Sequence, residues 1–449
     1  MLFRKIKSVI EAHLKSNSNK ILLIDGARQV GKSFIIREVA KTLFPNLIEI
    51  DMVKDFEGPK IFANVRTTED FYLQLSTFAG SKMRNKEDTI VFLDEIQQYP
   101  TLLTLLKFLA QEGKFTYIAS GSLLGVTLAN TTSIPMGSIR KIRMFPLDFE
   151  EFLIANGVNE IAINTMKTKF ENLEPLEESF HKRILDLFRR YLLVGGLPDA
   201  VNTYLNTHNI QFVRDLQSEI QEYYTADATK YDKEHKLHIS RIYNLIPSTL
   251  ENKKKRLIVQ DIENKKGAKY KTYLEDFDYL INSGIALEVK AISNPKYPLI
   301  ESETKNLLKL YLNDVGLLTN TLYSTNINAI LNDTNSINLG SVYETVVASE
   351  LIAHGFKLFY YDNRSKGEVD YIIDDYLNLT ALPIEVKSGK DYSVYSALNN
   401  LLSSEDYHIK KAYVLSNERL VKQKGKIVYL PIYYVMFITN TPKEEDLYF

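Results

Sequence analysis

The pattern of apolar and polar residues changes its period several times in the first third of the chain. An opening helix is predicted by apolar residues at helical spacing, namely Leu2, Ile6, Val9, Ile10 and Leu14. Short continuous apolar runs, typical of strands buried on both faces of a parallel sheet, follow at residues 21–24, 47–50, 89–93 and 115–119. A helical stretch at 102–110 separates the last two runs. This alternation predicts a parallel sheet wrapped by helices over residues 1–155.

The pattern divides the rest of the chain into three further parts. Leucine-rich helical periodicity over residues 156–235 predicts a helical lid, interrupted by a turn at 195–198. Two helical stretches, a lysine-rich segment and β-like pieces at 286–292 favour a winged-helix-like segment over residues 236–300. A second α/β domain is predicted over residues 301–449, from a helix at 342–353 and strands at 357–361, 369–373, 383–386, 412–415 and 427–430.

Composition narrows the classes of protein that fit. The 449 residues contain no cysteine, which excludes disulfides, a thiolate nucleophile and zinc or iron–sulfur sites with cysteine ligands. The 55 Lys and Arg nearly balance the 56 Asp and Glu, so any affinity for nucleic acid must come from a local basic patch. No apolar run approaches the roughly 18 residues of a membrane span, and the start lacks the apolar stretch of a signal peptide. We therefore expect a cytoplasmic protein without a membrane anchor.

A phosphate-binding loop is predicted directly after the first strand. The pattern G-x-x-x-x-G-K-[ST] is matched at every fixed position by Gly26, Ala27, Arg28, Gln29, Val30, Gly31, Lys32 and Ser33. Such a loop points backbone N–H groups at phosphate oxygens, and the following helix adds its dipole. We expect Lys32 to face solvent without a ligand and to neutralise the β and γ phosphates of ATP, while the Ser33 hydroxyl binds Mg²⁺.

Two carboxylates after the apolar run at 89–93 supply the second half of this site. Acids at the end of a buried strand need a cation or a water-filled cleft. We expect Asp94 to hold Mg²⁺ and Glu95 to act as general base on the attacking water, which makes the chain an ATPase. Ser120 ends the next apolar strand and is a candidate for holding that water or the γ-phosphate. A plain strand-ending turn explains Ser120 equally well.

The chain resembles the AAA-type ATPases that carry a C-terminal domain of unknown function with a restriction-endonuclease-like fold, of the PD-(D/E)XK type. Beyond the loop at 26–33, the resemblance lies in Leu-Asp-Glu-Ile-Gln (93–97), Ala-Ser-Gly-Ser (119–122), Phe-Pro-Leu-Asp-Phe-Glu-Glu-Phe (145–152), Gly-Gly-Leu-Pro (195–198), Tyr-Leu-Asn-Asp-Val-Gly-Leu-Leu (311–318) and Pro-Ile-Glu-Val-Lys-Ser-Gly (383–389). Relatives place Gly-Arg before the Phe-Pro-Leu segment, whereas Ser138 follows Gly137 here. Arg140 and Arg143 are nearby candidates for an arginine finger that the resemblance does not identify. The resemblance implies that the turn at 195–198 approaches the nucleotide, whereas a plain helix-breaking turn explains these residues equally well.

The C-terminal part carries a second set of acidic residues. Asp370 opens one predicted strand, and Glu385 and Lys387 share one face of the next, so a hairpin would bring Asp370 beside Glu385. Two acids that bind Mg²⁺ and a lysine that assists the reaction suit metal-dependent phosphodiester cleavage, with Glu344 as a further metal ligand. The group resembles the PD-(D/E)XK nuclease pattern. An exposed strand face with a cross-strand salt bridge is the structural alternative.

Two lysine-rich runs, at 253–256 and 265–271, lie inside the predicted winged-helix-like segment. They form a local positive patch that could contact DNA phosphates, although solvated loop charge is the commoner explanation. Two functions remain open. The chain is an ATPase that acts on, or is regulated by, nucleic acid through a nuclease-like domain, or it is an ATP-driven switch whose C-terminal domain binds a protein. Either function permits a homo-oligomer or a partner protein.

Overall fold

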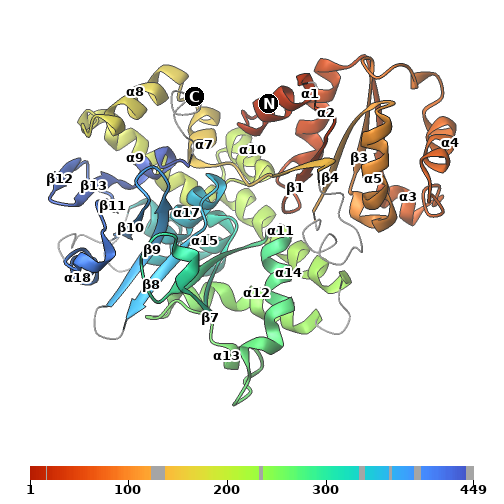
Figure 1. Cartoon of the computed structure of the whole chain (residues 1–449). Helices are drawn as coiled ribbons and strands as arrows, with labels where there is room; N and C mark the ends of the chain where they lie inside the picture. The colour runs from red at the N-terminus through yellow and green to blue at the C-terminus, as the bar shows by residue number, and fades with distance from the viewer. Residues whose placement is uncertain are drawn as a thin grey trace. The chain divides into compact units, whose positions relative to one another are not determined.

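The computed structural model describes residues 1–16, 18–122, 137–231, 236–332, 339–363, 367–388 and 396–440. The chain divides into two compact units (Figure 1), one formed mainly by residues 3–145 with 278–285 and the other by 146–277 with 286–449. The first unit contains a five-stranded sheet whose neighbouring strands are all parallel. Its order is β2 (Asn46–Asp51), β3 (Thr89–Asp94), β4 (Thr116–Gly121), β1 (Ile21–Asp25) and β5 (Ile139–Arg143).

Helices cover both faces of this sheet. Its α-helices are α1 (Ile6–Lys15), α2 (Lys32–Leu43), α3 (Met52–Glu57), α4 (Thr68–Ala79) and α5 (Pro100–Glu112). Apolar residues of α4 and α5 share one core with alternate residues of β1 to β4, while α2 contacts β2, β3 and β4. Short 3-10 turns lie at η1 (Gly80–Lys82) and η2 (Ile96–Gln98). The predicted parallel sheet is thereby confirmed, because strands buried on both faces carry continuous apolar runs.

The fifth strand was not predicted. β5 has the sequence Ile-Arg-Lys-Ile-Arg and lies at the edge of the sheet, partly exposed. With only two apolar residues it lacks the run that marked the other strands. Its pairing with β1 is therefore a tertiary effect that local periodicity does not reveal.

The second unit begins with helices, as the periodicity predicts. Their bounds are α7 (Phe149–Ala155), α8 (Glu160–Glu171), α9 (Glu178–Val194), α10 (Pro198–Thr207), α11 (Ile210–Tyr231), α12 (Lys236–Glu251), α13 (Val259–Glu263) and η3 (Tyr270–Tyr273). The helix α14 (Leu274–Asn282) starts in this unit, and its last residues belong to the first. Within the described residues, no helix is both long and apolar enough to span a membrane.

An eight-stranded mixed sheet completes the second unit. Its order is β12 (Lys422–Lys424), β13 (Ile427–Pro431), β11 (Ala412–Ser416), β10 (Thr380–Val386), β9 (Gly367–Asp375), β8 (Phe359–Asn363), β6 (Ala286–Ile292) and β7 (Glu303–Leu312). The remaining helices are α15 (Val315–Tyr323), α16 (Ile327–Leu331), α17 (Gly340–Ala353) and α18 (Ser396–Leu402), with 3-10 turns at η4 (Leu299–Ser302), η5 (Glu405–Tyr407) and η6 (Ile432–Phe437). All five strands predicted between 357 and 430 are present.

The expected winged-helix-like segment requires a correction of its boundary. Three helices do precede an antiparallel hairpin, β6 and β7. That hairpin is not a separate ribbon, however, because β6 also pairs in parallel with β8 and so joins the C-terminal sheet. The sheet therefore begins at Ala286, before the expected boundary at residue 301.

Candidate functional site

The loop at 26–33 joins the end of β1 to the start of α2. Gly26 has φ +145° and Gly31 has φ +93°, values that side chains disfavour. A Cβ on Gly26 would lie 2.2 Å from the carbonyl oxygen of Met144, so this position has room only for glycine. The loop leads into the N-terminus of a twelve-residue helix, which attracts anions. Its geometry fits a phosphate group.

Lys32 contradicts one expectation, because it does not face solvent. Its side chain is buried, and its Nζ donates to the carbonyl oxygens of Gly26 (2.9 Å) and Ala27 (2.7 Å). Burial lowers the pKa of Lys32, and the nearby carboxylates of Glu95, Asp25 and Asp94 oppose that shift. The ammonium group is therefore held against the loop's own backbone, and a phosphate must compete with two carbonyl oxygens for it.

Asp94, at the end of β3, lies beside two serines that were predicted to belong to the same site, Ser33 and Ser120. Ser120 donates its hydroxyl to Asp94 Oδ1, since β4 lies between β3 and β1 and brings Ser120 to the same edge. Burial raises the pKa of Asp94, whereas hydrogen bonds from Ser120 and Ser33 lower it. The two predicted Mg²⁺ ligands, Ser33 and Asp94, thus lie close to one another. Hydroxyl and carboxylate oxygens are suitable ligands for that ion.

Glu95 follows Asp94 in a left-handed conformation, with φ +52°. Its Oε2 accepts hydrogen bonds from the Ser122 hydroxyl (2.9 Å) and from the side-chain amide of Gln97. Two donors from different elements hold this carboxylate in place. Glutamate is rare in the left-handed region, and such strain is common at functional sites. Sequence reasoning singled out Ser120, but it is Ser122 that positions Glu95.

The structure gives the candidate arginine fingers different surroundings. Arg143 forms an ion pair with the buried Asp25 (3.1 Å) and donates to the carbonyl oxygens of Ile281 (3.3 Å) and Asn282 (2.8 Å). Asp25 immediately precedes the phosphate-binding loop. Arg143 therefore anchors the strand that enters the loop, while Arg140 is exposed.

The glycine turn at 195–198 is explained by a buried carboxylate of the second unit. Asp314 accepts hydrogen bonds from the N–H groups of Gly196 (2.6 Å) and Leu317 (3.2 Å). A Cβ on Gly195 would lie 2.1 Å from Asp314 Oδ1. Burial raises the pKa of Asp314 to about 6, although the backbone donors oppose this shift. The turn thus has a structural reason for its glycines that does not involve a nucleotide.

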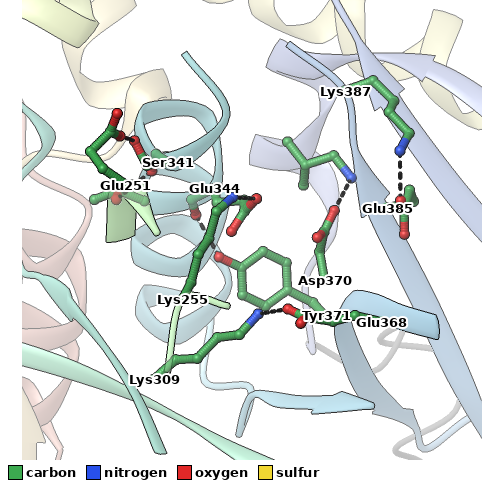
Figure 2. A network of polar contacts seen from close by, with 12 residues as sticks. Glu251, Lys255, Lys309, Ser341, Glu344, Glu368, Asp370, Tyr371, Glu385 and Lys387 are labelled. Atoms are coloured by element: carbon green, nitrogen blue, oxygen red, sulfur yellow. Dashed lines mark hydrogen bonds and ion pairs between the residues drawn. The ribbon is translucent and has the colours of Figure 1, made fainter. Parts of the chain in front are cut away.

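The C-terminal carboxylates come together as the hairpin geometry predicts (Figure 2). Asp370 on β9 accepts the Val386 N–H group (2.8 Å), and Glu385 on β10 accepts from Lys387 Nζ (2.7 Å). The other oxygen of Glu385, Oε2, is buried and has no hydrogen-bond partner among the described residues. Burial raises the pKa of both acids, and repulsion from Glu385 adds to the shift of Asp370. A buried carboxylate oxygen without a donor fits a cation.

Glu344 lies near this pair, and its charge adds to the raised pKa of both acids. Its Oε2 accepts the Tyr311 hydroxyl (3.0 Å), and its Oε1 is bonded to Lys255 (Figure 2). A further ion pair joins Lys309 on β7 to Glu368 on β9, two strands that are not adjacent in the sheet. The two-residue spacing of Lys309 and Tyr311, which puts both on one face of a strand, was the signal that could have revealed them.

Within the part of the chain that is described, one group of three Asp, Glu or His side chains has ligand atoms all within 4.8 Å of one another. It consists of Asp148, Glu350 and His354, and does not include Glu344. Asp148 accepts the Glu151 N–H group (2.8 Å) and Glu350 accepts that of Phe149 (2.6 Å). Two members of this group, Asp148 and Glu350, therefore cap the N-terminus of α7.

The basic run at 253–256 is bound to acids of its own unit. Lys254 (3.6 Å) and Arg256 (4.0 Å) both contact Asp362, and Lys255 contacts Glu344. The lysines of the second run, Lys265, Lys266, Lys269 and Lys271, are exposed, as are Lys253 and Lys254 of the first. The two runs differ in that ion pairs with acids engage three of the four basic residues of the first run. Gly389, the last residue of the sequence motif that includes Glu385, lies outside the described residues.

Three known families match successive parts of the chain. Residues 18–153 match an AAA domain, residues 185–329 match the domain of unknown function DUF8612, and residues 339–435 match the domain of unknown function DUF4143. Residues 18–153 therefore form an AAA domain. The AAA match covers the complete constellation around Lys32 and Asp94, and this family generally uses ATP with Mg²⁺.

Solved structures show only remote similarity to this chain. The Walker-type ATPase paby2304 of Pyrococcus abyssi is 15% identical, with 74% of this chain and 96% of that chain covered and a TM-score of 0.44. DnaA from Aquifex aeolicus bound to AMPPCP is 10% identical, covering 63% and 88%, with a TM-score of 0.32. Cdc6p from Pyrobaculum aerophilum is 13% identical, covering 74% and 95%, with a TM-score of 0.27. No curated protein matches the chain significantly. The identification therefore rests on the family matches.

Proposed function

We propose that the first unit hydrolyses ATP with the residues assembled around the phosphate-binding loop. Bound Mg²⁺ would offset negative charge on the transferred phosphoryl group. In this proposal, Ser33 and Asp94 hold the ion, Lys32 pairs with the β and γ phosphates, and Glu95 removes a proton from the attacking water. The observation that supports these roles is the approach of the Ser33 hydroxyl to Asp94, which lowers the pKa of that carboxyl and brings a loop hydroxyl and a strand carboxylate together.

We further propose that Asp370 and Glu385 bind a divalent metal and that the C-terminal domain cleaves or binds nucleic acid. The unsatisfied Glu385 Oε2 beside Asp370 supports this proposal more than any other feature. Lys387, bonded to the opposite oxygen of Glu385, would stabilise charge that develops on a phosphodiester. In the same proposal the helices before β6 form a winged-helix-like module, and exposed lysines at 265–271 contact DNA phosphates.

A direct test supplies DNA and Mn²⁺ to the full chain and to two variants. Asp370→Asn should lose both metal binding and cleavage, because it removes a ligand charge. Lys387→Ala should keep metal binding and lose cleavage, because this lysine serves the reaction. A wild-type chain that neither cleaves DNA nor binds Mn²⁺ at millimolar concentrations would overturn the proposal.

One observation favours the second function, an ATP-driven switch whose C-terminal domain binds a protein. Lysines already pair with carboxylates throughout this cluster, as expected for a structural relic of a metal site. Stimulation of ATP hydrolysis by DNA separates the two functions. Such stimulation is expected only if the C-terminal domain acts on nucleic acid.

A further inference from the structure

The acidic cluster of the second unit contains its own cations. Four carboxylates belong to it, those of Glu344, Glu368, Asp370 and Glu385, and three lysines pair with members of this set, namely Lys255, Lys309 and Lys387. With all seven groups charged, the cluster carries a single negative charge. A divalent cation would reverse the sign of this charge while three ammonium groups stayed in place. In a buried site such an excess of positive charge is costly, so metal entry favours the departure of one lysine.

The three lysines differ in how firmly the fold holds them. Lys309 belongs to β7 and its side chain is 1% exposed, and Lys387 directly follows β10, where its N–H group donates to the Leu415 carbonyl oxygen (2.8 Å). Lys255 belongs to neither strand nor helix. It lies between α12 and α13, in a connection whose described backbone bonds include one from the Leu257 N–H group to Leu308 (2.9 Å). Lys255 can therefore leave with the least change to the sheet.

Lys255 also lies where it would compete with a metal ion for the carboxylates of this cluster. Its Nζ is bonded to Glu344 Oε1, and it stabilises the charged form of Asp370 more than any other cation near that carboxylate. Figure 2 shows its side chain extending from the connection toward the helix that carries Glu344. Its flanking residues, Lys254 and Arg256, are held by the more exposed Asp362.

Resting on the metal site proposed above, we propose that Lys255 is a resident counter-ion of the acidic cluster, which a divalent cation displaces on binding. Metal loading would then free Lys255 from Glu344 and loosen the basic segment 253–256, so that an external polyanion could compete with Asp362 for Lys254 and Arg256. By linkage, a polyanion that captures this segment would tighten metal binding by the same factor. The segment predicted to contact DNA would thus do so in the metal-loaded protein.

Mn²⁺ titration of the nucleotide-free full chain tests this competition, with Asp370→Asn as the baseline for binding elsewhere. Lys255→Met removes the charge and keeps the length of the side chain, so it should bind Mn²⁺ about 5- to 150-fold more tightly than the wild type, the usual range for coupled sites. Lys255→Arg should retain the wild-type affinity. Lys254→Met, the neighbouring control, should also leave the affinity unchanged.

Amide hydrogen exchange gives a second readout, which is measured on the wild-type chain and so does not depend on the folding of a Lys255 variant. Mn²⁺ should accelerate exchange over residues 252–258, including the Leu257 N–H group, and Asp370→Asn should abolish that acceleration. Equal Mn²⁺ affinity of Lys255→Met and wild type, or unchanged exchange with Mn²⁺ bound, would overturn the displacement of Lys255 and leave the metal site standing. Absence of Mn²⁺ binding above the Asp370→Asn baseline would instead overturn the metal site itself.

Discussion

The two candidate sites of this protein both bury lysine ammonium groups, but they satisfy them differently. Lys32 is bonded to backbone carbonyl oxygens of the loop that it serves. Lys255 and Lys387 are bonded to carboxylates that would themselves hold a metal. In the function proposed above, a phosphate would take over Lys32 without displacing a cation from the acids around it. In the second site a lysine and a metal compete for the same oxygens, so the first site is ready for its ligand and the second must exchange one cation for another.

The comparison between the two sites depends first on Glu95 acting as the general base of the site around Lys32. Glu95→Gln keeps the shape of the side chain and an oxygen that can accept from Ser122, but it cannot take a proton. We expect ATP binding to persist and turnover to fall roughly 10²- to 10⁴-fold, which is the usual contribution of a positioned general base. A phosphate-release assay measures this. The exposed Glu87 supplies the matched control, Glu87→Gln, and wild-type turnover in Glu95→Gln would assign the role to another group.

Replacement of Lys32 tests whether this lysine binds ATP as well as the backbone carbonyl oxygens of its own loop. Lys32→Ala should weaken ATP binding by about 10- to 100-fold, since charge-assisted hydrogen bonds to the phosphates are lost. Because Lys32 also bonds Gly26 and Ala27, we expect a lower melting temperature without nucleotide. Calorimetric titration with ATP measures the affinity, and Lys41→Ala, at an exposed position of the same helix, serves as control. Unchanged affinity for ATP would remove Lys32 from the site.

Asp314 sharpens the comparison, because it is a buried carboxylate held by backbone N–H groups, with Gly196 and Leu317 among the donors. Its pKa of about 6 lies above the ordinary value of 3.8, so the folded chain holds this proton more tightly than the unfolded chain. The free energy of unfolding should therefore fall as pH rises from about 4 to 6, by up to roughly 3 kcal/mol from this group.

Asp314→Asn does not titrate and should flatten the stability profile in this pH window, although the loss of charged hydrogen bonds lowers stability at neutral pH. Urea unfolding at a series of pH values measures the slope. The exposed Asp261 gives the control Asp261→Asn, which should keep the wild-type profile. Parallel profiles for wild type and Asp314→Asn would show that Asp314 does not carry the shift.

The smallest expected effect concerns the flanks of Lys255. Replacing Lys254 and Arg256 together by Ala should weaken DNA binding in Mn²⁺ equally across sequences and lower the salt slope by up to about 2, because each cation releases about one counterion. Anisotropy titrations at two salt concentrations measure this slope. Replacing Lys422 and Lys424, exposed on β12, should have no such effect. An unaltered salt slope in the first variant would show that Lys254 and Arg256 only pair with Asp362 and do not bind DNA.

The parts of the proposed ATPase site could be located from the sequence, because they are continuous in the chain. Eight consecutive residues form the loop proposed to bind phosphate, and Asp94 and Glu95 directly follow an apolar run. The order of the sheet then places β4 beside β3, so Ser120 reaches Asp94. Local patterns determine such a site, since strand, turn and helix each form over a few residues.

Only the tertiary structure decided which partners the charged side chains have. The sequence shows Lys255 as one of four consecutive basic residues, and nothing local distinguishes it from Lys254. Its burial against Glu344, 89 residues away, follows from the packing of the connection between α12 and α13 near α17 and the mixed sheet. Two other contacts also join residues far apart in the chain, that of Arg143 with a carbonyl oxygen of α14 and that of Gly195 with Asp314. Periodicity reports which face of an element is buried, whereas the charge that meets a given side chain depends on segments far away in the chain.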